Sequence, residues 1–226
     1  DKAIFFEGTV ERILLPLFTS KIDEQRKTCI LSEQYISSIE VGGAYIIKFK
    51  ELLEFLELKT LIITDIDSVQ KEASGTRVSY KKVAVKTNQD LLTSNITLKT
   101  WIPGREKVDD LLKKDIPKET ANSLIRVAYP LSVDNDSVKC GRSFEEAFII
   151  DNNKYMFDHR DSLLSISNLL NQFSNQQDIL DNSYEIQDFI DRNKKKTDFA
   201  FDLVNTNNDQ WVVPSYIKEG LEWLAK

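Results

Sequence analysis

Acidic side chains directly follow two predicted strands. The apolar runs 3–6 and 58–64 are typical of buried strands, and each one ends in polar residues. The acids that follow are Glu7 and Glu11 after the first run, and Asp65 and Asp67 after the second. Ligands of an open parallel sheet bind beyond the carboxyl ends of its strands, so we expect these four carboxylates to lie around one crevice.

Four neighbouring carboxylates predict a bound cation. Like charges at short range raise one another's pKa, and a divalent cation removes that conflict. Asp65 and Asp67 are two residues apart, so on an extended chain they face the same way. Hard oxygen ligands suit Mg²⁺, Mn²⁺ or Ca²⁺ better than zinc. Two other interpretations stay open at this point, because aspartyl-phosphate phosphatases also place an Asp-x-Asp pair after a strand, and aspartates commonly stabilise turns.

Strand and helix signals alternate in the first third of the chain. We expect a helix after Thr9, capped by that residue and kinked or shortened by Pro16, and a second helix over 44–56. A further strand is predicted over 36–41. Short connections between alternating strands and helices predict an α/β fold, with a parallel sheet flanked by helices on both faces.

The rest of the chain gives weaker signals. We expect a polar loop over 70–100 with a short hairpin at 78–85, and a fourth strand over 125–129. Helices are predicted over 105–114, 117–123, 144–149, 197–204 and 214–224. Residues 162–190 predict two amphipathic helices, which we interpret as part of a helical insertion at about 155–192. Residues 1–226 are therefore expected to form a single domain.

Composition narrows the class of protein. The chain has 226 residues, of which 41% are hydrophobic, and its net charge of -6 lacks the general positive coat of an indiscriminate nucleic-acid binder. No apolar run approaches the roughly 18 residues of a membrane span. The two cysteines cannot form a disulfide framework and no signal peptide is evident, so we expect a cytoplasmic protein without membrane partners. The missing initiator methionine leads us to expect a fragment of a longer chain.

Several residues are interpreted as structural. His159, the only histidine, is expected at the surface, and none of the seven tyrosines stands in a setting that predicts catalysis. The sequence contains no G-x-x-x-x-G-K-[ST] pattern, so no phosphate-binding loop of that type is expected.

The acidic motifs resemble those of a known family. Phe6-Glu7-Gly8 with Glu11, followed by Thr64-Asp65-Ile66-Asp67, is similar to the TOPRIM domain shared by topoisomerases, primases and several nucleases. Residues 142–149, Arg-Ser-Phe-Glu-Glu-Ala-Phe-Ile, resemble the third acidic motif of the OLD (overcoming lysogenisation defect) nucleases. Residues 196–200 resemble their lysine motif and 213–217 their final helix. The resemblance runs from Phe5 to Leu224 and is greatest to the class that includes the nuclease subunit of the Gabija anti-phage system.

This resemblance implies a DNA endonuclease that hydrolyses phosphodiester bonds with two Mg²⁺ or Mn²⁺ ions, in antiviral defence. It also allows Ca²⁺ as a non-catalytic or modulating ion. The implied metal ligands are Glu7, Glu11, Asp65, Asp67 and Glu145, and the implied catalytic residues are Glu7, Asp65, Asp67, Glu145 and Lys196. Glu146 stays an alternative to Glu145, and Lys194 and Lys195 stay alternatives to Lys196.

The resemblance further implies partners. They are DNA, an N-terminal ABC-type ATPase region that this chain lacks, and further copies of the full-length protein in a homo-oligomer.

Two other functions remain possible alternatives to a nuclease. One is a phosphatase or phosphotransferase with Asp65 as nucleophile and Asp67 as acid/base, and the other is a non-catalytic interaction module.

Overall fold

Four parallel strands form the central sheet of the molecule. The computed structural model of the chain describes residues 1–74, 77–131, 139–206 and 208–226. The strands are β1 (Lys2–Phe6), β2 (Ile36–Glu40), β3 (Lys59–Ile63) and β7 (Ile125–Ala128), in the order β2-β1-β3-β7. Both central strands, β1 and β3, bury nearly all of their residues, as expected for parallel strands covered on two faces. The predicted α/β fold is confirmed.

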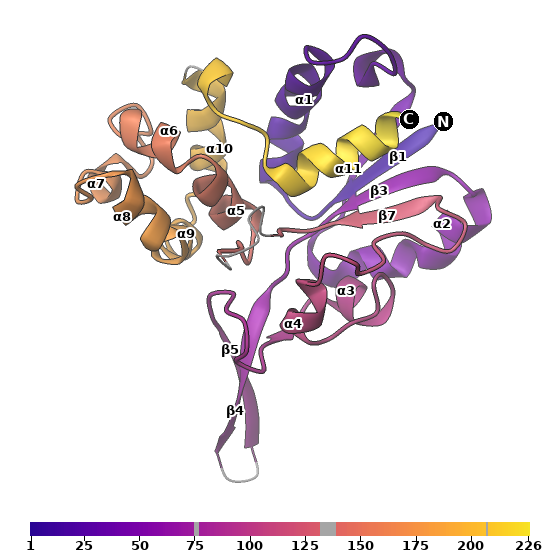
Figure 1. Cartoon of the computed structure of the whole chain (residues 1–226), viewed down its shortest axis with the longest axis horizontal. Helices are drawn as coiled ribbons and strands as arrows, with labels where there is room; N and C mark the ends of the chain where they lie inside the picture. Colours follow the sequence, from indigo (N-terminus) through magenta and orange to yellow (C-terminus); the bar gives the residue numbers. More distant parts are fainter. Residues whose placement is uncertain (75–76, 132–138, 207) are drawn as a thin grey trace.

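Helices cover both faces of this sheet (Figure 1). On one face lie α1 (Thr9–Asp23) and α11 (Ser215–Ala225), packed in a core with Ile4 and Phe6. On the other face lie the 3₁₀ helix η2 (Gly43–Phe49), α2 (Lys50–Leu56), α3 (Ile96–Thr100) and α4 (Val108–Leu111), in a second core with Ala3 and Phe5. Successive side chains of β1 thus enter opposite cores, because side chains alternate across a strand.

A layer of short helices extends the first core beyond the sheet. It comprises α5 (Phe144–Asp151), α6 (Asn153–Asp158), α7 (Ser167–Leu170), α8 (Gln176–Asp181), α9 (Ser183–Arg192) and α10 (Lys196–Asn205). Aromatic rings join this layer to the C-terminal region, since the Phe148 ring lies 5.5 Å from that of Trp211 and 5.9 Å from that of Phe199. The two helices predicted over 162–190 are in fact three, α7, α8 and α9. The single domain with an insertion at about 155–192 stays a prediction.

A second, antiparallel sheet begins directly after Asp67. Its strands are β4 (Ser68–Ser74), β5 (Arg77–Lys82) and β6 (Leu92–Thr93), in the order β5-β4-β6. The pair β4–β5 projects away from the rest of the molecule (Figure 1). The hairpin predicted at 78–85 is therefore wrong in its bounds. Its first strand lies in a polar stretch that has no apolar alternation, because both faces of the ribbon are exposed to solvent.

Three helix predictions need correction. Residues 44–56 divide into η2 and α2, the helix predicted over 105–114 shortens to α4, and residues 117–123 are not helical. In the last case the chain runs extended beside the edge strand β7, where Val127 N donates to Lys118 O at 2.8 Å and Thr120 N to Ile125 O at 2.9 Å. Pairing with an unprotected sheet edge prevails over the helix-start signal of Pro117. Two 3₁₀ helices, η1 (Leu31–Glu33) and η3 (Asn208–Gln210), were not predicted.

The start and course of α1 also differ from expectation. Gly8 occupies the N-cap position, and Thr9 is the first helical residue, with its hydroxyl donating to Glu40 Oε1 at 2.9 Å. The helix continues past Pro16 to Asp23. Pro16 and Arg12, whose carbonyl loses its helical partner, both lie on the exposed side of the helix. Water can hydrogen-bond to that carbonyl. The apolar residues on the opposite, buried face keep their packing, and the helix therefore continues past the proline.

None of the helices in the described ranges is long and apolar enough to cross a membrane.

Gly141 provides a test of how tightly the helical layer packs. A Cβ atom on Gly141 would lie 2.4 Å from Ala147 N, a backbone atom of α5 that cannot move alone. We expect Gly141→Ala to lower the free energy of unfolding by about 1–3 kcal/mol, the usual cost of overpacking. Gly42→Ala is the matched control, because a Cβ atom there meets nothing within 4 Å. Equal urea midpoints for the two variants, measured by circular dichroism, would contradict this packing.

Candidate active site

The carboxyl edge of the parallel sheet carries Glu7 and Glu11 after β1. Glu7 follows the last residue of β1, and Glu11 lies in the first turn of α1 with only 6% of its surface exposed. A Cβ atom on the intervening Gly8 would lie 3.0 Å from Glu11 Oε2. The glycine therefore leaves the space that the buried carboxylate of Glu11 occupies.

Asn95 links the acids of β1 to those of β3. Its side-chain amide donates to Glu7 Oε1 at 2.9 Å, to Thr64 Oγ1 at 2.6 Å and to the Asp65 carbonyl at 2.9 Å. The Thr64 hydroxyl donates to the same oxygen of Glu7. The Asn95 carbonyl oxygen caps α3 by accepting two backbone N–H groups. Sequence reasoning missed Asn95 because it lies in the segment predicted as a polar loop. The N-cap pattern before Ile96 is the signal that could have found it.

Asp65 and Asp67 have different partners. Asp65 Oδ1 accepts from Phe144 N at 2.9 Å, at the N-terminus of α5, where a negative charge is favoured. Asp67 Oδ1 accepts from Arg142 Nη2 at 2.8 Å. The backbone leaves the extended conformation at Asp67, which has a φ of 51°. The expectation that the two carboxylates face the same way rested on an extended chain, and that condition is not met.

The two neighbouring glutamates of α5 also diverge. Both are buried, with 2% and 3% of their surfaces exposed. Glu145 Oε2 accepts from the Ser143 hydroxyl at 2.9 Å. Glu146 Oε2 accepts from the backbone N–H of Arg142 at 2.7 Å, and its other oxygen lies 3.5 Å from the Ser183 hydroxyl of α9. Glu146 thus stabilises the start of α5 and the packing of α9, whereas Glu145 stands with the acids of the sheet edge.

Lys196 is the lysine that reaches these acids. It is the first residue of α10, and its Nζ lies 3.2 Å from Glu145 Oε1 and 3.9 Å from Asp191 Oδ1. Burial would lower the pKa of Lys196, but Glu145, Asp65 and Asp191 together raise it above its ordinary value. Lys195 donates instead to a backbone carbonyl at 2.5 Å, and Lys194 is exposed. The three lysines therefore have different environments.

Burial and mutual repulsion raise the pKa values of Glu7, Glu11 and Asp65. Burial, followed by the charges of Glu145 and Glu7, raises the pKa of Glu11 to about 8. Burial and, to a smaller extent, Asp67 raise the pKa of Glu7 to about 7, against the hydrogen bonds from Thr64 and Asn95. Burial, Glu7 and Asp67 raise the pKa of Asp65 well above its ordinary value. The protein alone does not neutralise the negative charge that it gathers here.

This donor set fits divalent cations in its chemistry. Carboxylate oxygens are hard ligands, and the raised pKa values report uncompensated negative charge. Within the described ranges, however, no three or more Asp, Glu, His or Cys side chains are arranged to hold a metal ion as they stand. Their oxygens accept hydrogen bonds from the chain's own donors instead, so the side chains must turn to bind an ion.

Tyr216 is a further residue at this site that sequence reasoning missed. It lies at the start of α11, which packs on β3, and it is 4% exposed. Its buried hydroxyl has no hydrogen-bond partner among the described residues. Burial, followed by the charges of Asp65, Glu11 and Glu145, raises its pKa well above the ordinary value. Only tertiary packing brings this tyrosine to acids from three distant segments.

The unpaired hydroxyl of Tyr216 predicts a stability change. An unsatisfied buried polar group costs about 1–3 kcal/mol, so Tyr216→Phe in the metal-free chain should raise the free energy of unfolding by about 1 kcal/mol. Tyr129→Phe is the matched control, because the buried Tyr129 hydroxyl donates to Leu111 O at 2.9 Å. That control should lose stability. Urea denaturation checks both, and a loss in both variants would show that the Tyr216 hydroxyl is satisfied.

The raised pKa values of Glu7 and Glu11 predict a pH dependence. Both values, about 7 and about 8, lie above the ordinary 4.5, so the native state binds more protons than the unfolded state between about pH 4.5 and pH 8. The free energy of unfolding in EDTA should therefore fall as the pH rises through this window. The charged groups that act on Glu11 are Glu7, Asp65, Glu145 and Lys196. Glu11→Gln should flatten this dependence of the free energy of unfolding on pH. Separately, Mn²⁺ should raise the free energy of unfolding of the wild type more at pH 8.5 than at pH 5.5.

Glu51→Gln, an exposed substitution in α2, is the control for this profile and should keep the wild-type slope. A Glu11→Gln slope equal to that of the wild type, measured by urea denaturation at four pH values, would rule out the buried carboxylate as the cause.

Comparison with known proteins finds similar sequences. Residues 1–67 match the family model described as overcoming lysogenization defect protein-like, TOPRIM domain, and TOPRIM domains generally bind divalent metal ions such as Mg²⁺. The whole chain is 29% identical over 236 aligned residues to Endonuclease GajA of Bacillus cereus (strain HuB5-5), and it spans 31% of that protein's length. No solved structure matches the chain significantly. Residues 1–67 are thus similar to an OLD-like TOPRIM domain, and the four-stranded parallel sheet is consistent with a TOPRIM-like fold.

Proposed function

We propose that this chain is the catalytic part of a metal-dependent DNA endonuclease. The observation that carries the proposal is the group of buried, mutually repelling carboxylates at the carboxyl edge of the sheet, with Lys196 in contact with one of them. The similarity to Endonuclease GajA supports the same activity. The reaction is hydrolysis of a phosphodiester bond.

The proposed metal ligands are the five acids Glu7, Glu11, Asp65, Asp67 and Glu145. They come from the segment after β1 together with α1, the segment after β3, and α5, which are far apart in the sequence. We propose two ions, Mg²⁺ or Mn²⁺, with Ca²⁺ as a non-catalytic or modulating ion. Bound ions of this kind lower the pKa of a coordinated water and neutralise charge on the phosphate and the leaving oxygen.

Lys196 provides a positive charge beside the ligands. Its raised pKa keeps it protonated throughout the physiological range. In the proposed mechanism it faces the scissile phosphate and stabilises negative charge that grows in the transition state. Its place at the start of α10, held by Glu145 and Asp191, restricts the ammonium group before substrate binds.

Surrounding polar groups hold the acids in position. Asn95 keeps Glu7 and the backbone of Asp65 together, and Arg142 holds Asp67. In the proposed mechanism they orient the ligands and take no part in proton transfer. Their substitution should therefore weaken metal affinity more than it changes the pH dependence of cleavage.

The phosphatase alternative accounts for fewer of these features. It uses Asp65 as nucleophile and Asp67 as acid/base, and it leaves Glu7, Glu145 and the lysine motif unexplained. It also predicts a phosphomonoester substrate. A non-catalytic module is disfavoured because every acidic position of the motif is occupied by an acid. Turnover of a phosphomonoester, compared with plasmid cleavage by the same preparation, separates these functions.

We also propose the setting in which the activity operates. Because the chain spans about a third of the relative that it matches, the complete protein is proposed to include an N-terminal ABC-type ATPase region. The full-length form is proposed to be a cytoplasmic homo-oligomer that acts on DNA in anti-phage defence.

Lys196 gives the sharpest test of this mechanism. Lys196→Ala should reduce Mn²⁺-dependent plasmid cleavage by about 10²-fold or more, a typical loss for a preorganised electrostatic group. Stabilisation by Mn²⁺ should persist in a melting scan, because lysine is not a ligand. Lys194→Ala is the matched control, since this neighbouring lysine is exposed, and it should cleave normally. Asp65→Asn should lose both cleavage and the Mn²⁺ shift.

Two results would contradict the proposal. Normal cleavage by Lys196→Ala would remove the lysine from the mechanism. Full cleavage by Asp65→Asn, or undiminished cleavage in EDTA, would remove the metal centre itself.

A further inference from the structure

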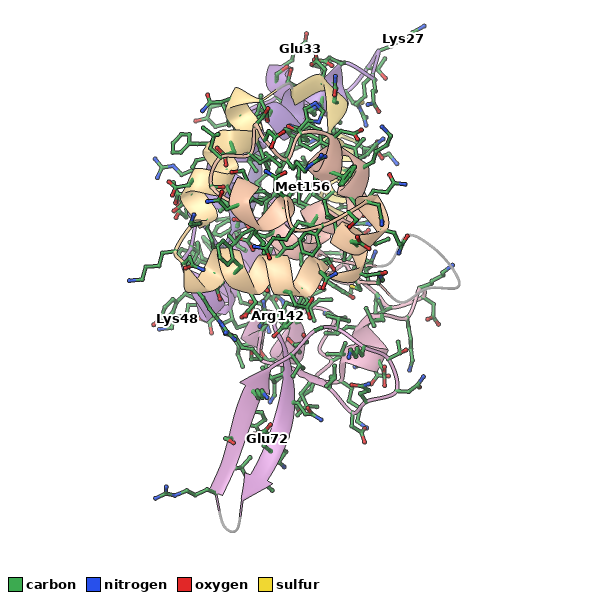
Figure 2. The ribbon with its side chains drawn as sticks, turned by 90° about the vertical axis from the view of Figure 1, so that its left-hand side faces the viewer. Lys27, Glu33, Lys48, Glu72, Arg142 and Met156 are labelled. Atoms are coloured by element: carbon green, nitrogen blue, oxygen red, sulfur yellow. The ribbon has the colours of Figure 1, made fainter. Side chains whose placement is uncertain are left out.

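The β4–β5 ribbon is an arm that starts at the candidate active site. β4 begins at Ser68, directly after Asp67, and its seven residues span about 23 Å at 3.3 Å per residue. Figure 2 shows Glu72 on this arm, far from the helical layers, and Arg142, the partner of Asp67, near its base. The arm therefore extends outward from a residue of the proposed metal centre.

The base of the arm is fixed to the body of the protein. The Ser68 hydroxyl donates to Val83 O at 2.5 Å, and Lys82 Nζ lies 3.2 Å from Asp191 Oδ2 of α9. The Tyr184 hydroxyl of α9 donates to Lys82 O at 3.3 Å. The contacts of Asp191 and Tyr184 come from the same helix that supplies Asp191 to Lys196. They hold the arm in a set direction relative to the site.

The outer part of the arm has no apolar support of its own. Every residue of β5 is exposed, and so are Gln70, Lys71, Glu72 and Ala73 of β4. A two-stranded ribbon with both faces in water is marginally stable. It nevertheless presents Val78 and Tyr80 with about half of their surfaces exposed, at 51% and 57%. These properties are typical of a surface that a partner covers.

The charge of the arm identifies the partner's chemistry. Residues 69–82 contain four basic residues and one acid, whereas the whole chain has a net charge of -6. Lys71, Arg77 and Lys81 form no ion pair with any described residue. Cross-strand pairing sets Lys71 opposite Tyr80 on one face, while Arg77 and Lys81 lie on the other. Cations on both faces suit an arm that lies between two rows of phosphates.

We propose that the β4–β5 arm binds duplex DNA by lying in its major groove, and so guides the phosphodiester backbone to the acidic site at its base. The major groove, about 12 Å wide, accommodates a two-stranded β-ribbon. Lys71, Arg77 and Lys81 contact phosphates, and Tyr80 and Val78 pack against the sugars of the backbone. The proposal rests on the proposed nuclease function, and it predicts affinity without sequence preference, because phosphate contacts carry no sequence information.

Charge reversal on the arm tests this proposal. The test variant combines Lys71→Glu, Arg77→Glu and Lys81→Glu, and the control combines Lys27→Glu, Lys48→Glu and Lys114→Glu, three exposed lysines elsewhere. Both sets change the net charge equally. Binding to a fluorescein-labelled 20-base-pair duplex is measured in EDTA, without cleavage. Loss of three phosphate contacts should weaken binding on the order of 10²-fold at 0.1 M salt and reduce the salt slope by about 2.7.

A neutral set of variants guards against misfolding. Lys71→Gln, Arg77→Gln and Lys81→Gln together should keep the wild-type urea midpoint and still lose affinity and salt dependence. Duplex affinity equal to the wild type in either arm variant overturns the proposal. So does a wild-type chain that does not bind the duplex at low salt. An arm variant that keeps its affinity but dissociates a dimer in sedimentation shows that the arm contacts a second copy instead.

A small substrate separates the arm from the chemistry. Bis(4-nitrophenyl) phosphate is a phosphodiester too small to reach the arm, so the arm variants should hydrolyse it with Mn²⁺ at the wild-type rate while they cleave plasmid poorly. Equal losses on both substrates would overturn the guiding role. If the wild type hydrolyses neither substrate, the proposed nuclease function fails, and the binding measurement in EDTA still decides whether the arm holds DNA.

Discussion

Repulsion among buried carboxylates at one edge of a parallel sheet is the constraint around which this molecule is built. Glu11 lies in α1 and Asp65 follows β3, and burial together with neighbouring acids disfavours the charge of both. An arrangement of this kind weakens the metal-free fold, since desolvated like charges raise one another's pKa. A cation that binds the native state alone would return the lost stability.

The two cores supply the stability that such a site requires. Alternate residues of β1 and β3 enter different cores, so both faces of the sheet are anchored. The aromatic contacts of Phe148 with Phe199 and Trp211 join α5 to α10 and the C-terminal segment. Since α5 carries Glu145 and α10 carries Lys196, this apolar packing also sets the separation between the acid and the lysine. The hydrophobic layer and the charged site thus depend on the same helices.

Two polar side chains beside the acids each hold a different acid in position. Asn95 caps α3 and donates to Glu7 at the same time, so the second core is linked to the sheet edge. Arg142 pairs with Asp67, at the point where the central sheet gives way to the β4–β5 arm. A change in the arm can therefore reach the acids through a single salt bridge and the short segment between β3 and β4. The arm and the acidic edge are thus continuous along the chain.

Local sequence by itself determined the parallel sheet, because buried parallel strands are continuous apolar runs that end at polar residues, as residues 3–6 and 58–64 do. It also identified the acids that directly follow these strands, because the carboxyl ends of parallel strands lie at one edge of the sheet. The exposed arm and the extended segment 117–123 were beyond it, because the first lacks a buried face and the second pairs with β7, which becomes an open edge of the sheet only in the folded chain. Only the tertiary structure separated Glu145 from Glu146 and Lys196 from its neighbours, and only it brought Tyr216 to the acids. The physical reason is the same in each case: the direction of a side chain at a helix start depends on what packs against that helix, and those partners lie far away along the chain.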